Sequence, residues 1–181
     1  HIAEKGYSNG LKLGISGPIT FGFSAALRNP GPYGNVRNME LYNDVALVVN
    51  RVARLIQSYG CVIQIDEPGV SAGFLDPERI LEPIEIATEG LEPRLTSMHV
   101  CGKLNPKTVR CLTMVRNVGI LSLEFAGSPG NIDLLSRSVL EDSAKKIGVG
   151  CMRVNVLSKD DLTTPENAAG IIGKAVSKIG F

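Results

Sequence analysis

Five short apolar runs alternate with longer segments in which apolar residues recur every three or four positions. Short runs rich in branched side chains are typical of buried strands, whereas the three-to-four spacing is typical of helices. The expected strands are 11–16, 61–66, 94–98, 119–123 and 147–155. The expected helices are 39–59, one from about Asp76, one from Asn105, 132–146 and one from Thr164. Strict alternation of strand and helix predicts an α/β fold with a parallel sheet.

Glycine, proline and capping residues mark the ends of these elements. Gly60 follows the first long helical segment as a C-cap, and Asp76 with Pro77 is typical of a helix start. The segment 21–38 is rich in Gly, Pro and Asn, which predicts a long loop. Loops of that length in compact domains often cover a binding site, so this one is a candidate lid.

Two architectures agree with the alternation of strands and helices. An open doubly wound sheet would be complete with five strands, whereas a (β/α)8 barrel would lack three βα units. No glycine-rich nucleotide-binding loop follows any of the expected strands. Polar residues do follow strand after strand, namely Asp66, Glu67, His99, Cys101, Glu124, Arg153 and Asn155.

Reactive side chains at the carboxyl end of successive strands are typical of the barrel. The sequence therefore predicts residues 1–181 to be a single, partial (β/α)8 barrel (TIM barrel) domain with about five βα units. An open half-barrel would expose two sheet edges, so further residues or pairing with another chain are expected.

The candidate chemistry centres on His99 and Cys101. Two residues apart at a strand end, their side chains point to the same side. Glu124 ends the next apolar run, and a parallel neighbouring strand would bring it beside them. Imidazole, thiolate and carboxylate are ligands that Zn²⁺ accepts. The other reading of His99 and Cys101 is a hydrogen-bonded histidine and a buried cysteine.

Composition narrows the class of protein. The chain has 181 residues, 44% of them hydrophobic, and a formal net charge of +1. That balance gives no reason to expect nucleic acid or membrane partners, and no apolar stretch is long enough to span a bilayer. Four cysteines in a chain of this size favour reduced thiols and a cytoplasmic protein. Cys61 and Cys111 are expected in the core, and the terminal His1 is given no role.

Four motifs in order resemble those of cobalamin-independent methionine synthases. Residues 62–68 (VIQIDEP) resemble the I-Q-x-D-E-P signature of that family, and Met98–Cys101 resembles its H-x-C zinc motif. Leu121–Glu124 resembles the segment with its zinc-binding glutamate, and Gly14–Pro18 its G-P segment. The resemblance runs from about residue 11 to 150 and implies the C-terminal catalytic barrel or the shorter stand-alone archaeal-type version.

The resemblance also implies a ligand set and a substrate. Zinc would be held by His99, Cys101, Glu124 and a second cysteine in an N-P-D-C segment, which does not occur in this chain. We therefore expect the fourth ligand beyond Phe181, with Cys151 as the in-chain alternative. Asp66 is the expected catalytic residue and would bind the substrate ammonium group. Glu67 is expected to help bind the substrate from beside the site, or else to serve as a helix cap or loop anchor.

One departure from the family concerns the methyl donor. Arg153 and Asn155 stand where folate-dependent members have an aspartate and a histidine, and that histidine is associated with protonating the departing folate. A methylated corrinoid needs no such proton, so a methyl-corrinoid, free or carried by a corrinoid protein, stands beside methyltetrahydrofolate as a candidate donor. The predicted function is zinc-dependent methyl transfer to homocysteine, giving methionine.

Two other functions remain open from the sequence. One is a corrinoid-protein methyltransferase of the uroporphyrinogen decarboxylase-like group, which acts on another thiol such as coenzyme M. The other is a metal-free binding or scaffold module. The Asp66-Glu67-Pro68 motif and Glu124 favour the methionine synthase reading over the first of these, and a metal assay separates it from the second.

Overall fold

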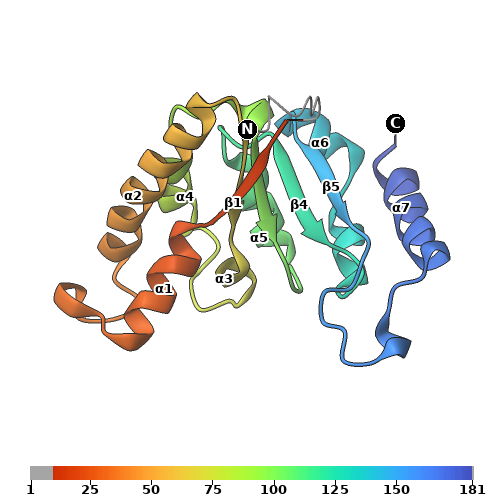
Figure 1. The fold of residues 1–181 in the computed structure, drawn as a ribbon, viewed down its shortest axis with the longest axis horizontal. Coiled ribbons are helices and arrows are strands. Elements are labelled where there is room, and N and C mark those ends of the chain that lie inside the picture. Colours follow the sequence, from red (N-terminus) through yellow and green to blue (C-terminus); the bar gives the residue numbers. More distant parts are fainter. Residues whose placement is uncertain (1–9, 181) are drawn as a thin grey trace.

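The computed structural model describes residues 10–180 and contains one five-stranded parallel sheet (Figure 1). The strands follow one another across the sheet in chain order, β1-β2-β3-β4-β5. Their bounds are β1 Lys12–Ser16, β2 Val62–Asp66, β3 Thr96–Val100, β4 Ile120–Glu124 and β5 Lys146–Gly150. Every pair of neighbours is parallel, which requires a crossover connection between each strand and the next.

Within residues 10–180, six α-helices and several short 3-10 turns make these connections, and a seventh helix follows β5 (Figure 1). The helices are α1 Pro18–Arg28, α2 Met39–Ser58, α3 Pro68–Ser71, α4 Leu81–Thr88, α5 Pro106–Met114, α6 Arg137–Ser143 and α7 Pro165–Ile179. Side-chain caps open two of the helices as the sequence predicts. Asn105 accepts a hydrogen bond from the Thr108 backbone N–H at the start of α5, and Thr164 accepts one from Asn167 at the start of α7. No helix within residues 10–180 has the length and apolar character needed to cross a bilayer.

The two faces of the sheet differ in chemistry. Register places Ile65, Met98 and Leu121 in one row, and these apolar side chains pack in cores with residues of the surrounding helices. On the opposite face the matching row is Asp66, His99, Ser122 and Gly148. Alternation along each strand produces this division, so the polar row is the one that the helices leave free.

The strand order separates the two architectures that the sequence left open. In a doubly wound sheet the strand order reverses at a switch point, whereas in this sheet each new strand is added to the same edge. The fold is thus α/β with a parallel sheet in consecutive order, as predicted. Within the described residues, however, the sheet is open and does not close into a barrel.

The expected loop at 21–38 is wrong over its first part. Residues 18–28 form helix α1, which starts with Pro18 and buries Ile19 and Ala26. Gly22 does not break this helix. A Cβ built on it would lie 2.8 Å from the ring of Tyr42, so the missing side chain lets α1 pack closely against α2. A 3-10 turn at Gly31–Tyr33 follows, and the irregular segment is correspondingly shorter.

Two other helix boundaries also differ from expectation. Asp76 does not cap a helix: its backbone carbonyl accepts from Arg79 in a turn, and α4 begins only at Leu81. The helix expected over 132–146 is divided into a 3-10 turn at Pro129–Leu134 and the short α6. Ala144 ends α6 in the left-handed conformation, at φ 53°, and β5 starts two residues later.

Strand β5 is shorter than the sequence predicted. Its last residue, Gly150, pairs with Glu124, the last residue of β4. Beyond that point β4 offers no backbone partner, so the chain turns away and the Cys151 N–H bonds back to the Val149 carbonyl. Arg153 and Asn155 consequently lie in an exposed segment after the strand.

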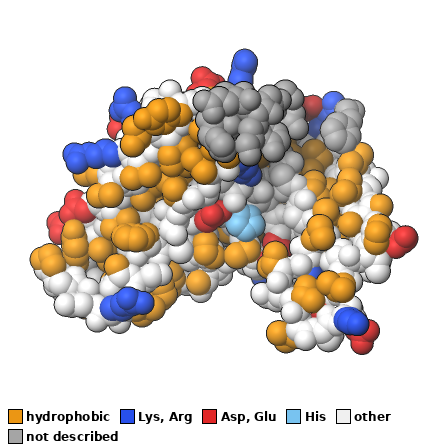
Figure 2. All heavy atoms as spheres, viewed as in Figure 1, with side chains coloured by type: hydrophobic (Ala, Val, Ile, Leu, Met, Phe, Trp, Pro, Cys, Tyr) orange, Lys and Arg blue, Asp and Glu red, His pale blue; other side chains and the backbone are white. Residues whose placement is uncertain are grey.

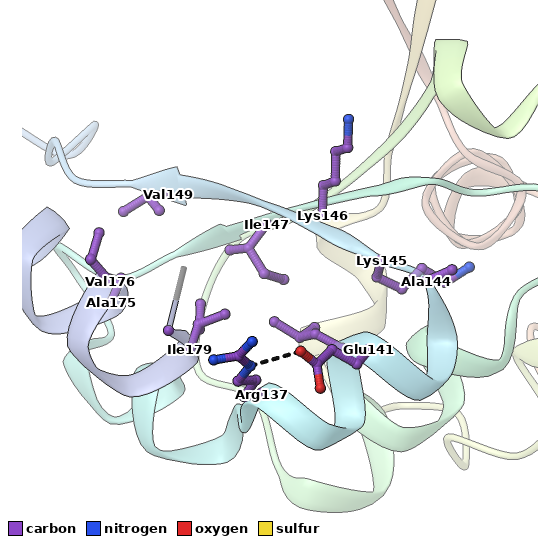
Figure 3. Close-up of a pocket in the computed structure, with 12 residues that line it drawn as sticks. Arg137, Glu141, Ala144, Lys145, Lys146, Ile147, Val149, Ala175, Val176 and Ile179 are labelled. Atoms are coloured by element: carbon purple, nitrogen blue, oxygen red, sulfur yellow. Dashed lines mark hydrogen bonds and ion pairs between the residues drawn. The ribbon is translucent and has the colours of Figure 1, made fainter.

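Both edges of the sheet are flanked by apolar surface. Next to β5, a cavity of about 590 Å³ lies between the strand and helices α6 and α7, lined in part by Ile147, Val176 and Ile179 (Figure 3). At the β1 edge, exposed apolar side chains gather over α2 (Figure 2). They include Leu47, Val48, Val52 and Leu55.

Candidate active site

The predicted site residues meet at the carboxyl ends of β2, β3 and β4. Asp66 ends β2 and is in register with His99 of β3, and His99 is in register with Ser122 of β4. Cys101 follows β3, and Glu124 ends β4 two residues beyond Ser122. All four of these candidate side chains are half-buried, so solvent and small molecules can reach them. Figure 2 shows histidine atoms in pale blue near the middle of this face.

The imidazole of His99 is oriented by the neighbouring strand. Its Nδ1 lies 3.0 Å from the backbone carbonyl of Ser122, and a carbonyl can only accept, so Nδ1 carries the proton. In the neutral form of the ring, the other nitrogen, Nε2, then keeps its lone pair. A backbone carbonyl on one ring nitrogen is the arrangement that commonly fixes a metal-binding histidine.

Cys101 and Glu124 lie beside each other at the ends of their strands. The Gly102 backbone N–H donates to Glu124 Oε2 at 2.6 Å, which ties the carboxylate to the turn after Cys101. Burial, then the charge of Glu124 and then that of Asp66, raise the pKa of the Cys101 thiol. The thiol therefore faces two carboxylates, and a nearby cation would be needed to favour its thiolate.

The glycine at position 127 leaves room for the Glu124 side chain. A Cβ built on Gly127 would lie 2.0 Å from Glu124 Oε1, well inside contact distance. Any larger residue would force the carboxylate to move. Gly127 thus shapes the site without contributing a functional group to it.

These donors suit zinc by their chemistry. They are one imidazole with a free Nε2, one thiol and one carboxylate, which together form a common zinc ligand set. Within residues 10–180 no group of three or more His, Cys, Asp or Glu side chains is already close enough to hold an ion. The strands thus bring the backbone positions together, and the side chains would still have to converge on a metal.

Asp66 is held by a neighbour on its own strand. The Gln64 side-chain amide donates to Asp66 Oδ1 at 2.7 Å. On β1, a Cβ built on Gly14 would lie 3.0 Å from Asp66 Oδ2, so this glycine gives the carboxylate its space. Asp66 is thereby held half-buried on the polar face of the sheet, with Oδ2 beside Gly14.

Glu67 has a different role from its neighbour. Its side chain is fully buried, with 0% of its surface exposed, and it lies at the N-terminus of α1. Its two carboxylate oxygens accept hydrogen bonds from the backbone N–H groups of Ile19 and Thr20, both at 2.9 Å. The Thr20 hydroxyl donates a third at 2.7 Å. Of the two roles that the sequence left open for Glu67, the geometry agrees with the helix-capping anchor.

The environment of Glu67 raises its pKa to about 7. Burial is the main cause, and it outweighs the lowering effect of the Thr20 and Ile19 hydrogen bonds; the charge of Asp66 raises it further. Gly17 is packed against this carboxylate so closely that a Cβ there would lie 2.3 Å from it. The Glu67 backbone N–H also donates to the His99 carbonyl at 2.8 Å. Glu67 therefore joins α1, β2 and β3 at the point where the site residues emerge.

Thr20 is a structural residue of the site region that sequence reasoning missed. Its hydroxyl donates to Glu67 and accepts from the Gly69 backbone N–H at 3.0 Å. It thereby connects the start of α1 to the start of α3. The only signal in the sequence is its place after Gly17-Pro18, where a threonine on the first helical turn is common and carries no special meaning.

The other residues singled out from the sequence lie apart from this group. Cys151 follows β5 one residue after Gly150 and belongs to no group of three or more possible metal ligands within residues 10–180. Arg153 is 3.6 Å from Asp161 in an exposed ion pair, and Asn155 is exposed. Cys61 and Cys111 are buried, as predicted. All four cysteines are free thiols, and His1 lies outside the described residues.

Comparison with known proteins identifies the family. Residues 3–177 match the family described as cobalamin-independent synthase, catalytic domain. The chain therefore belongs to the cobalamin-independent methionine synthase family, as its motifs predicted.

Three archaeal relatives, each named methionine synthase, are also similar. The chain is 32% identical to that of Methanocaldococcus jannaschii over 142 residues, 78% of this chain and 43% of the relative. It is 33% identical to that of Methanothermobacter thermautotrophicus over 146 residues, which cover 80% of this chain and 45% of the relative. The protein of Methanothermobacter marburgensis is 30% identical over 161 residues, which cover 88% of this chain and 50% of the relative. The chain thus spans about half the length of these relatives.

Proposed function

We propose that the chain is part of the catalytic domain of a zinc-dependent methyltransferase. This enzyme methylates the thiol of homocysteine and gives methionine. The single observation that carries this proposal is the grouping of Asp66, His99, Cys101 and Glu124 at one end of a parallel sheet. Membership of the synthase family and the printed name of the three relatives support the reaction.

His99, Cys101 and Glu124 are the residues that would hold zinc. When bound, zinc supplies the Lewis acidity that keeps a substrate thiol deprotonated near neutral pH, where a free thiol with a pKa of about 8.5 is mostly protonated. The fourth ligand is a cysteine outside the 181 residues, and Cys151 remains the in-chain alternative. The Ser122 carbonyl keeps the His99 ring in the orientation that leaves Nε2 free.

Asp66 binds the ammonium group of the amino acid substrate. It lies in register with His99, so a substrate whose sulfur is held near His99 and Cys101 reaches Asp66 with its amino end. Glu67 fixes the backbone from which Asp66 projects, because it joins β2 to α1. The sulfur lone pair forms the new carbon–sulfur bond, and the donor keeps the electron pair of the bond that breaks.

The methyl donor is a methylated corrinoid in this proposal. A folate nitrogen must be protonated as it leaves, whereas cobalt leaves with its electron pair and takes no proton. Arg153 and Asn155 stand where a proton donor would be needed, and Arg153 is engaged by Asp161. The experiment below separates this proposal from three alternatives. They are methyltetrahydrofolate as the donor, coenzyme M as the accepting thiol, and a metal-free scaffold role.

The sheet is one arc of a (β/α)8 barrel, and residues 1–181 are part of one catalytic barrel domain. The consecutive parallel strand order supports this, as does the apolar surface beside both edge strands, which further βα units would cover. We also propose a cytoplasmic location, on the ground of the four free thiols.

The test combines metal content with methyl transfer. After loading with zinc and desalting, the purified protein should retain about one equivalent of zinc. Cys101→Ser or Glu124→Gln should lower the affinity for zinc at least tenfold. Cys111→Ala, a change at a buried cysteine of α5, is the matched control and should retain the metal. Less than about half an equivalent in the unmodified protein would support the scaffold role instead.

The same preparations should then be offered methylcobalamin or methyltetrahydrofolate, with homocysteine or coenzyme M. Methionine formation from methylcobalamin that is lost in Cys101→Ser supports the proposal. Methylation of coenzyme M alone, or full activity in Cys101→Ser, would refute it.

A further inference from the structure

A second polar concavity lies next to the candidate active site. It has a volume of about 370 Å³ and is lined by the segment after α3, the turn after β3 and the start of α5. Three of its lining side chains are cations: Arg37, Arg79 and Lys103. Asp76 is the one acidic side chain among its lining residues.

The positive charge of this cavity is not neutralised within the part of the chain that the structure describes. Asp76 directs its carboxylate to Lys107, at 3.1 Å, and that lysine does not line the cavity. None of the ion pairs within residues 10–180 involves Arg37, Arg79 or Lys103.

Two of the three cations are held near each other by the backbone. Arg79 Nη2 donates to the carbonyl of Arg37 at 3.5 Å, which links the segment before α2 to the turn before α4. Like charges gathered in one concavity repel each other and focus a positive potential there. An anion that enters would relieve that repulsion, and the planar guanidinium groups match the geometry of phosphate and carboxylate oxygens.

The cavity shares a wall with the candidate active site. Lys103 comes two residues after Cys101, and Ser71 of α3 follows the Asp66-Glu67-Pro68 motif. The two segments touch: a Cβ built on Gly102 would lie 2.8 Å from Ser71 Oγ. Gly102 is also the residue whose N–H holds Glu124. A molecule bound in the cavity is therefore next to the residues proposed to hold the thiol.

We propose that this cavity binds an oxyanion of the methyl donor, a phosphate or a carboxylate, and so directs the donor's methyl group toward Cys101 and Glu124. Both donor classes considered above carry such groups away from the methyl: corrinoids a phosphodiester, and folates glutamyl carboxylates. The assignment of the anion to a methyl donor rests on the proposed function.

The direct test is a titration of the full chain with inorganic phosphate and, separately, with glutarate. Binding is monitored by NMR at about 20 mM chloride. The double variant Arg37→Ala with Arg79→Ala should weaken binding of the preferred anion about tenfold, since it removes two of the three cations of the cavity. Arg79→Lys keeps the charge and should retain most of the affinity. The matched control removes Arg51 and Arg54, two exposed arginines of α2 outside the cavity, and should leave binding unchanged.

The identity of the tighter anion distinguishes the sources, since phosphate points to a phosphodiester-bearing donor and glutarate to a glutamyl carboxylate. Equal affinity in the unmodified chain and in the Arg37/Arg79 double variant would overturn the proposal, as would an equal loss in the Arg51/Arg54 control. The titration contains no donor or thiol, so its outcome does not depend on whether methionine is formed.

A kinetic arm tests the link to the donor. The Arg37/Arg79 double variant should raise the KM for the donor about tenfold and leave kcat within about twofold, because removal of a binding contact made equally in ground and transition states acts on KM. A fall in kcat with an unchanged donor KM would overturn the proposed role in donor binding.

Discussion

The buried carboxyl of Glu67 gives the stability of the protein a specific pH dependence. The pKa of Glu67 is raised from its ordinary value of 4.5 to about 7, mainly by burial. Between these two values the folded chain keeps a proton on Glu67 that the unfolded chain has released. Folding then binds a proton, so the free energy of unfolding falls as the pH rises through this window.

The size of the effect follows from the displacement of the pKa. Each unit of pKa difference corresponds to about 1.4 kcal/mol, so this carboxyl lowers the free energy of unfolding by about 3 kcal/mol between pH 4.5 and 7. Glu67→Gln keeps the size of the side chain and removes the titration. The free energy of unfolding of the unmodified protein should therefore fall by about 3 kcal/mol relative to that of Glu67→Gln across this window.

Urea unfolding followed by circular dichroism at several pH values measures this difference directly. Other titrating groups act equally on both proteins, so subtraction isolates Glu67. Glu82→Gln, at an exposed carboxylate in the first turn of α4, is the matched control for removal of a negative charge. A difference between the unmodified protein and Glu67→Gln that stays constant from about pH 4.5 to 7.5 would refute the reasoning.

Two further predictions concern the surroundings of the site. Thr20→Val keeps the shape of the side chain but leaves the Gly69 N–H without its acceptor, so it should lower the free energy of unfolding by about 1–3 kcal/mol in the same urea assay; an unchanged midpoint would contradict the hydrogen-bond assignment. Gly127→Ala should displace the Glu124 carboxylate and weaken zinc binding about 10–100-fold by competition with a chelating dye. Gly130→Ala, whose added Cβ meets no atom within 4 Å, is its control, and equal zinc affinity in both variants would argue against Glu124 as a ligand.

Much of the fold could be predicted because its signals are local. The apolar spacing of α2 and the caps at Asn105 and Thr164 lie within a few residues of the elements they define. The candidate site could be predicted for a related reason. In a parallel sheet with consecutive strands, residues that end neighbouring strands must meet at one edge, so Asp66, His99 and Glu124 come together from strand order alone.

Helix α1 could not be predicted by the same means. Gly22 reads as a helix breaker in the sequence, and only the ring of Tyr42, twenty residues away, explains why the helix needs a glycine there. The end of β5 is a similar case. Its apolar run continues past Gly150, but a strand needs a partner, and β4 stops at Glu124.

The sequence by itself determined the order of strands and helices and the residue types of the site, because these follow from short-range periodicity and from motifs. Only the tertiary structure distinguished Asp66 from Glu67. The two carboxylates are adjacent in the chain, yet Asp66 is half-buried on the polar face of the sheet and Glu67 is fully buried at the N-terminus of α1. The hydrogen bonds of Glu67 come from Ile19 and Thr20, nearly fifty positions away, and these distant partners decide its environment and hence its chemistry.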